Sequence, residues 1–288
     1  MGAALPVARF IHDAALTLLF GGLLFPLYAM RSPERSRRSL LLTTLRIEAV
    51  VAVLSAVAVF ALSVGSMAGS LGAVFDFGLL KETALSEDFG WLFLVRTGLL
   101  TAVLIGLAAG RTGGVVTALA GLALAGLALT GHAREGAGWR PPAHVALDAV
   151  HLLTAGLWLG ALPWFAVLLR PNSDPSLDAL AAVRRFSAVA AMAVAALLAT
   201  GVAATWMLVD SPLALLPTTW GRLLILKAEL AMVMVVLAAL NRWRVTPGIA
   251  GGSHRAAAAL RRNAKVELLL GMAVLAVVGL LGTLPFDG

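Results

Sequence analysis

The sequence consists largely of apolar stretches about as long as a bilayer is thick. A transmembrane helix needs roughly 20 mostly apolar residues to cross a hydrocarbon core of about 30 Å. Eight stretches approach or exceed that length, at 7–30, 45–68, 91–110, 114–131, 144–169, 186–209, 219–241 and 265–284. Only 13% of the residues are charged, against about 25% in a soluble domain. The chain is therefore predicted to be an all-α, polytopic transmembrane helical bundle.

The predicted spans leave no room for a separate soluble domain. We predict one integral membrane domain over 1–288, with four helices in 1–131 and four in 144–285. The connection at about 69–90 is expected to lie along the membrane interface as a short amphipathic helix. The stretch 242–264 is expected to be a basic connector. No internal repeat is visible, although eight helices leave room for a four-plus-four duplication.

Positive charge is distributed unevenly between the two sides of the predicted bundle. The connections after the first, third, fifth and seventh spans carry 15 of the 22 Lys and Arg residues. Cytoplasmic loops carry such an excess, so this side is predicted to be cytoplasmic and both termini to lie outside. The calculated pI of about 11.1 is then a topology signal and not the mark of a nucleic-acid binder.

Several chemistries have no residues to support them. The chain has no cysteine, which excludes thiolate metal sites, iron–sulfur clusters and disulfides. It contains no phosphate-loop, zinc-protease or nucleophile-elbow motif. We therefore expect neither an ATP-driven pump nor a hydrolase, and we predict that the protein is not an enzyme.

Four of the five histidines are predicted to lie in or near the outer leaflet. His12 is in the first span, His132 follows the fourth, and His144 and His151 are in the fifth. Charged and polar groups in spans are costly and mark candidate functional sites. Imidazole ligates copper, zinc, iron and nickel. The four histidines are therefore candidate metal ligands, and hydrogen-bonded packing roles are the alternative for each.

Carboxylates and thioethers at the same level could complete such a site. Asp148 shares one helix face with the fifth-span histidines, at a spacing of 0, +4 and +7, and Asp13 follows the first histidine. A carboxylate orients a ligating imidazole from the second shell. Met67 and Met207 end the second and sixth spans, and thioether sulfur favours Cu(I). Packing is the alternative role for both methionines.

A lysine lies in the seventh span, about two turns from its outer end. Lys227 needs an acidic partner, a water-filled cavity or snorkelling to the interface. Glu229 is on the same helix but not three or four residues away, so an acid from another helix is expected. Four charged residues near the inner surface are expected to form ion pairs between helices: Arg46, Glu48, Lys265 and Glu267.

These residues fall into motifs that resemble the bacterial copper resistance protein D (CopD) family. The first motifs are Gly131-His132-Ala133 and the run from Asp148 through His151 and Trp158 to Gly160. The others are Arg185-Phe186-Ser187, Thr200-Gly201, Trp220-Gly221, Leu223-Leu224-Ile225-Leu226-Lys227, Asn241-Arg242 and the helix of Glu267. The resemblance covers most of 130–285 and, more loosely, the first four helices.

The resemblance implies a multi-pass bacterial inner-membrane protein that handles copper arriving from the periplasm. It implies copper uptake into the cytoplasm, copper resistance and a periplasmic CopC-like copper-binding partner. His132 and His151 would bind the ion, as Cu(I) or Cu(II), with His12 and His144 as further ligands. Trp220 stands where relatives often carry tyrosine, and its indole donates a hydrogen bond but cannot accept one.

A second class of function remains open from the residues alone. Histidines on facing transmembrane helices can ligate haem b, and His12 and His151 lie at comparable depths. The alternative to copper handling is therefore a haem-b membrane electron carrier.

Overall fold

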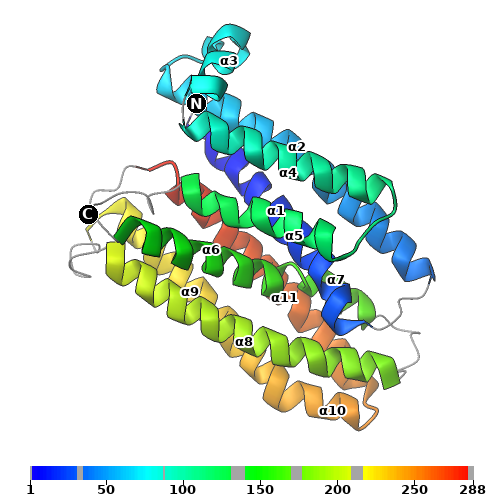
Figure 1. Ribbon diagram of the computed structural model, residues 1–288. Helices are drawn as coiled ribbons and strands as arrows, with labels where there is room; N and C mark the ends of the chain where they lie inside the picture. Colours follow the sequence, from blue (N-terminus) through cyan, green and yellow to red (C-terminus); the bar gives the residue numbers. More distant parts are fainter. Residues whose placement is uncertain are drawn as a thin grey trace.

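The computed structural model describes residues 2–30, 35–86, 88–130, 140–169, 177–208 and 217–284 as a bundle of helices (Figure 1). In the first half these are α1 (Ala4–Ala29), α2 (Arg35–Met67), η1 (Gly72–Phe75), α3 (Phe77–Ser86), α4 (Asp88–Ala108), α5 (Gly114–Ala125) and η2 (Gly126–Thr130). In the second half they are α6 (Arg140–Leu159), α7 (Leu162–Leu168), α8 (Leu177–Leu208), α9 (Thr219–Leu240), the π-helical turn η5 (Asn241–Val245), α10 (Thr246–Ala250) and α11 (His254–Leu281).

The predicted polytopic helical bundle is confirmed. Seven of the described helical segments are long and apolar enough to cross a membrane, and Gly114–Thr130 is a shorter apolar helix. In Figure 1, α1 begins and α11 ends at the same end of the bundle, as an even number of crossings requires. We therefore treat the chain as spanning the membrane.

Helix α1 forms the centre of the bundle. It packs against α2, α5, α6, α8 and α11, and its side chains Leu16, Leu19, Leu23 and Phe25 are at most 1% exposed. The other long helices present large apolar side chains outward, as lipid-facing helices do. Leu54 and Trp206, for example, are 65% and 83% exposed.

One expected boundary is wrong. The stretch 242–264, expected as a connector, is mostly helical: α9 continues through η5 and α10, and α11 already begins at His254. The span expected at 144–169 is present as Pro142–Leu168, but it is interrupted at Gly160 and Ala161, between α6 and α7. Pro163, at the start of α7, has no amide hydrogen to donate back along α6. Apolar composition does not show either feature.

A short helix occupies the connection between α2 and α4, as expected. Helix α3 is capped by Asp76, whose Oδ1 accepts hydrogen bonds from the amides of Gly78 and Leu79 at 3.0 and 3.1 Å. Phe75 and Phe77 beside the cap are 78% and 81% exposed. Exposed aromatic side chains of this kind suit a helix at the membrane interface.

Two of the four residues expected to form ion pairs near the inner surface, Arg46 and Glu267, make other contacts instead. Arg46 Nε donates to the Leu107 carbonyl at 3.0 Å, which joins α2 to the end of α4. Glu267 accepts a hydrogen bond from Asn241 Nδ2 at 2.6 Å. Helix-end carbonyls have no partner within their own helix, and this makes them acceptors for the arginine.

Candidate functional site

The histidine of α1 is hydrogen-bonded to α2. His12 is 1% exposed, and its Nδ1 lies 3.0 Å from Oγ of Ser55. The neighbouring Asp13 is within electrostatic range of Arg9 on α1 and of Arg96 on α4. These contacts connect α1 to α2 and α4.

The deeper histidine of α6 makes a matching contact with α8. His151 Nδ1 lies 3.0 Å from Oγ1 of Thr200, which is buried. The imidazole packs over Gly201, where an added Cβ would lie 3.6 Å from its Cε1. Each of these two histidines is therefore fixed by a hydroxyl from the next long helix.

The hydroxyl protons determine which imidazole nitrogen carries hydrogen. Ser55 donates to the Ala52 carbonyl at 3.2 Å, and Thr200 donates to the Ala196 carbonyl at 2.7 Å. A hydroxyl has one proton, so in both contacts the oxygen accepts the hydrogen bond and the imidazole Nδ1 donates it. The other nitrogen, Nε2, then carries a lone pair, which is the form that ligates a metal ion.

The Nε2 atoms therefore determine where a ligand could bind. Nε2 of His12 is buried and has no hydrogen-bond partner among the described atoms. A buried polar atom without a partner is rare in folded proteins and often marks an unoccupied ligand or water position.

Residues on one face of α6, namely His144, Asp148 and His151, lie close to one another or to the lysine of α9. His144 is 9% exposed and lies within electrostatic range of Asp148. Asp148 is also in range of Lys227, as is His151. The acid expected for Lys227 from another helix is thus Asp148 of α6.

The remaining candidates lie at or near helix ends or outside the described residues. Met67 is 72% exposed at the end of α2, and Met207 is partly buried near the end of α8. Trp220 is buried and packs with Leu281 of α11. His132 lies outside the described residues.

The described residues do not by themselves form a complete metal site. Across these parts of the chain, no group of three or more His, Asp or Glu side chains is placed to hold a metal ion together. The structure therefore fixes single imidazoles with their supporting groups, and further ligands must come from elsewhere.

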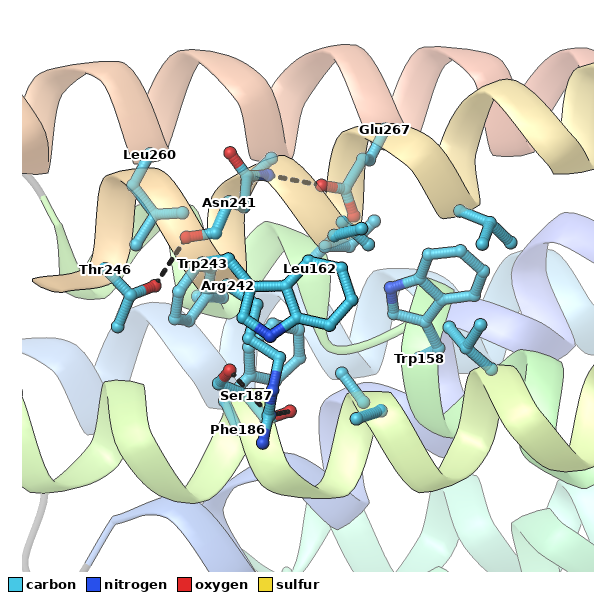
Figure 2. Close-up of a pocket in the computed structure, with 18 of the residues that line it drawn as sticks. Trp158, Leu162, Phe186, Ser187, Asn241, Arg242, Trp243, Thr246, Leu260 and Glu267 are labelled. Atoms are coloured by element: carbon cyan, nitrogen blue, oxygen red, sulfur yellow. Dashed lines mark hydrogen bonds between the residues drawn. The ribbon is translucent and has the colours of Figure 1, made fainter.

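A second polar group borders a cavity of about 300 Å³ at the other end of the bundle (Figure 2). Figure 2 shows Glu267 hydrogen-bonded to Asn241, with the indole of Trp158 on the side of the carboxyl group. Asn263 donates to Asn241 Oδ1 at 2.6 Å, and Arg242 donates to the Ser187 carbonyl at 2.6 Å. Apart from Thr246, the rest of the lining is apolar.

Three features of this region are not evident from the sequence: the roles of Ser55 and Arg96, and the cavity. A hydroxyl or a cation inside an apolar span is a usable signal, but the helix that it faces is not encoded locally. Small residues on several helices produce the cavity, and no single stretch indicates it.

Comparison with protein families gives two matches that together cover most of the chain. Residues 180–281 match the model described as Copper resistance protein D. Residues 1–141 match the model described as Copper resistance protein D-like, N-terminal domain.

Curated proteins of similar sequence are bacterial. Inner membrane protein YebZ of Escherichia coli (strain K12) is 33% identical, over 96% of this chain and 97% of that protein. Copper resistance protein D of Pseudomonas syringae pv. tomato is 30% identical, over 96% of this chain and 94% of that protein. Copper transport protein CutJ of Bacillus subtilis (strain 168) is 30% identical over 49% of this chain and 25% of that protein. No solved structure matches the chain significantly.

Proposed function

The chain belongs to the copper resistance protein D family, and from that premise we propose that it carries copper from the periplasm toward the cytoplasm. It is a multi-pass protein of the bacterial inner membrane. The relatives' names describe resistance and transport rather than a catalysed reaction. Copper is the substrate in this proposal, and a periplasmic CopC-like protein delivers it.

The proposed entry site is on α6. The observation that carries it is the contact between His151 and Thr200, which leaves Nε2 of the imidazole as a metal ligand. His144 is on the same helix face and supplies a second imidazole nearer the helix start. His132, in the connection before α6, is a proposed third ligand.

Asp148 and Lys227, which lie beside this site in electrostatic range of each other, have a proposed role in passage. A charge inside the membrane is costly unless it is paired, and Asp148 and Lys227 compensate each other's charge. An arriving copper cation would compete with Lys227 for Asp148. We propose that this exchange couples copper binding to a change in the contact between α6 and α9.

The inner part of the proposed path contains the polar group at the cavity. Trp158 follows His151 by seven residues, a rise of about 10 Å along the helix. Glu267 and Asn241 at that level supply oxygen ligands. They provide a polar step between the entry site and the cytoplasmic side.

The ion can be identified with the purified full-length protein. Cells supplied with both copper and iron are expected to yield protein that contains copper and shows no haem absorbance band. Vesicles containing the protein are expected to accumulate external copper faster than vesicles without it. Stoichiometric iron with a haem band would replace this proposal with the haem-b electron carrier, and the absence of both metals together with no uptake would contradict both functions.

Substitution of Lys227 distinguishes a coupling role from snorkelling. Lys227→Arg keeps the positive charge facing Asp148 and is expected to retain copper uptake. Lys227→Ala leaves Asp148 without its cation and is expected to slow uptake about tenfold, the lower range for removal of an outer-shell group at a metal site. Copper uptake into vesicles is the measurement. Glu229→Gln on the exposed side of α9 is the control. Equal copper uptake by all variants would mean that Lys227 only snorkels to the membrane interface.

A further inference from the structure

Helices α1 and α6 touch each other through equivalent residues. A Cβ added at Gly21 would lie 2.5 Å from Gly160 Cα, and one added at Gly160 would lie 2.9 Å from Gly21 Cα. Gly21 also faces the carbonyl of Gly156, and Gly160 faces the carbonyl of Thr17. Such reciprocal contacts are the property of a two-fold symmetric interface.

The positions in this contact have the same spacing on both helices. Gly21 follows His12 by nine residues, and Gly160 follows His151 by nine. Thr17 follows His12 by five residues, as Gly156 follows His151. The two histidines therefore occupy equivalent heights on two helices related by an approximate two-fold axis.

The next helices repeat the relation. The hydroxyl partner is Ser55 on α2 for His12 and Thr200 on α8 for His151, each at 3.0 Å. Each hydroxyl donates its hydrogen bond to a carbonyl of its own helix. Both imidazoles are thus fixed by the same second-helix contact.

The third long helix of each half supplies a cation. Arg96 on α4 follows Gly90 by six residues, and Lys227 on α9 follows Gly221 by six, in Gly90-Trp-Leu-Phe-Leu-Val-Arg96 and Gly221-Arg-Leu-Leu-Ile-Leu-Lys227. Arg96 is in electrostatic range of His12 and Asp13. Lys227 is in range of His151 and Asp148. Both sets thus contain a carboxylate, although Asp13 follows its histidine by one residue and Asp148 precedes its histidine by three.

The fourth helices complete the pattern. Helix α5 packs against α1 and α6, and α11 packs against α1, α6 and α7. The first half contributes α1, α2, α4 and α5, and the second contributes α6 with α7, α8, α9 and α11. Four crossings return the chain to its starting side, so the halves are parallel repeats with their axis along the membrane normal.

We infer that the chain is an internal duplication of a four-helix unit and that the N-terminal unit holds a second copper site, at Nε2 of His12. This site rests on the proposed function for the identity of the ion. Nε2 of His12 is buried without a partner among the described atoms, and the Asp13 carboxylate offsets part of the positive charge of Arg9 and Arg96, which are both in electrostatic range of the imidazole. The unit therefore presents a neutral imidazole with a fixed lone pair, as the C-terminal unit does.

The two units differ in how tightly their second and third long helices pack against each other. In the first, Phe60 of α2 stacks on Phe93 of α4 with ring centroids 4.1 Å apart, and Arg46 joins the same helices. In the second, α8 and α9 barely touch along their described lengths. The equivalents of Arg46 and Leu107 there are Ala191 and Ala238, which line the cavity. The site at His12 is therefore closed, and its copper exchanges more slowly than copper at His151.

The experiment counts copper in the full-length protein after loading with Cu(I) and removal of free ion. The wild type is expected to hold two copper ions, His12→Ala one, His151→Ala one, and the double variant none. His12→Asn keeps a donor toward Ser55 but has no imidazole lone pair, and it provides the same count if the alanine variant misfolds. Chase with a Cu(I) chelator is expected to remove the His151 copper first.

The outcomes separate this inference from the proposed function. One copper in the wild type, lost in His151→Ala and kept in His12→Asn, overturns the second site and leaves the proposed function standing. No copper in any protein overturns the proposed function and the second site together. If the His12→Asn protein still binds two copper ions, the second site is elsewhere and the inference is overturned.

Discussion

Replacing His151 with alanine is expected to abolish copper binding at the C-terminal site and copper uptake, while the protein still folds in the membrane. The substitution removes the Nε2 lone pair but leaves Thr200 bonded to the Ala196 carbonyl, so no buried hydroxyl loses its acceptor. Loss of a direct ligand is expected to exceed the 10–100-fold effect of outer-shell groups. Competition with a Cu(I) chelator measures the affinity, and vesicle uptake measures transport.

Thr200→Val is the matched variant for this prediction. It keeps the shape of the threonine and removes only the oxygen that accepts from His151 Nδ1. We expect the copper affinity to fall by about 10–100-fold, between that of the wild type and that of His151→Ala. Wild-type affinity in His151→Ala would remove His151 from the copper site, and equal losses in both variants would mean that the hydrogen bond, not the ligand, controls binding.

Replacing Gly21 with alanine is expected to destabilise the whole bundle, because this position is the contact between α1 and α6. The added methyl group would meet backbone atoms of Gly156 and Gly160, and backbone cannot move aside as a flexible side chain can. Overpacking of this kind costs about 3 kcal/mol at the upper end of its usual range. Close helix contacts in membranes depend on such small residues.

The free energy of unfolding in detergent, followed by circular dichroism, measures the effect. Gly98→Ala is the control, because a Cβ there meets nothing within 4 Å. Alanine favours helix by about 1 kcal/mol over glycine, so this variant is expected to be as stable as the wild type or more so. A Gly21→Ala protein as stable as Gly98→Ala would contradict the close crossing of α1 and α6.

The number of apolar spans could be predicted from composition because bilayer thickness imposes a length on each of them. The boundaries could not. Helix α11 begins at His254, well before the apolar residues start, because polar residues continue a helix outside the hydrocarbon as readily as apolar ones do. The break at Gly160 is also invisible in hydropathy, since glycine and alanine are not polar.

The candidate site was predictable to a similar degree. A histidine in an apolar span is visible in any sequence, and its spacing to Asp148 on the same helix follows from helix geometry. The partner on another helix is not visible. The contact with Ser55 was not identified, and Glu267 forms a hydrogen bond with Asn241 instead of the expected ion pair, since helix packing determines which side chains meet.

The class of protein, the number of apolar spans and the family can be read from the sequence alone, because hydrophobic length and local motifs are properties of contiguous residues. Which hydroxyl fixes each imidazole, and that α1 and α6 meet as equivalents, is set by the packing of the helices. The sequences of the two halves show no visible repeat, so the relation between the halves is seen in the contacts of their residues and not in the residue types. Those contacts depend on close approach at Gly21 and Gly160, and close approach is a property of packed helices that no single helix contains.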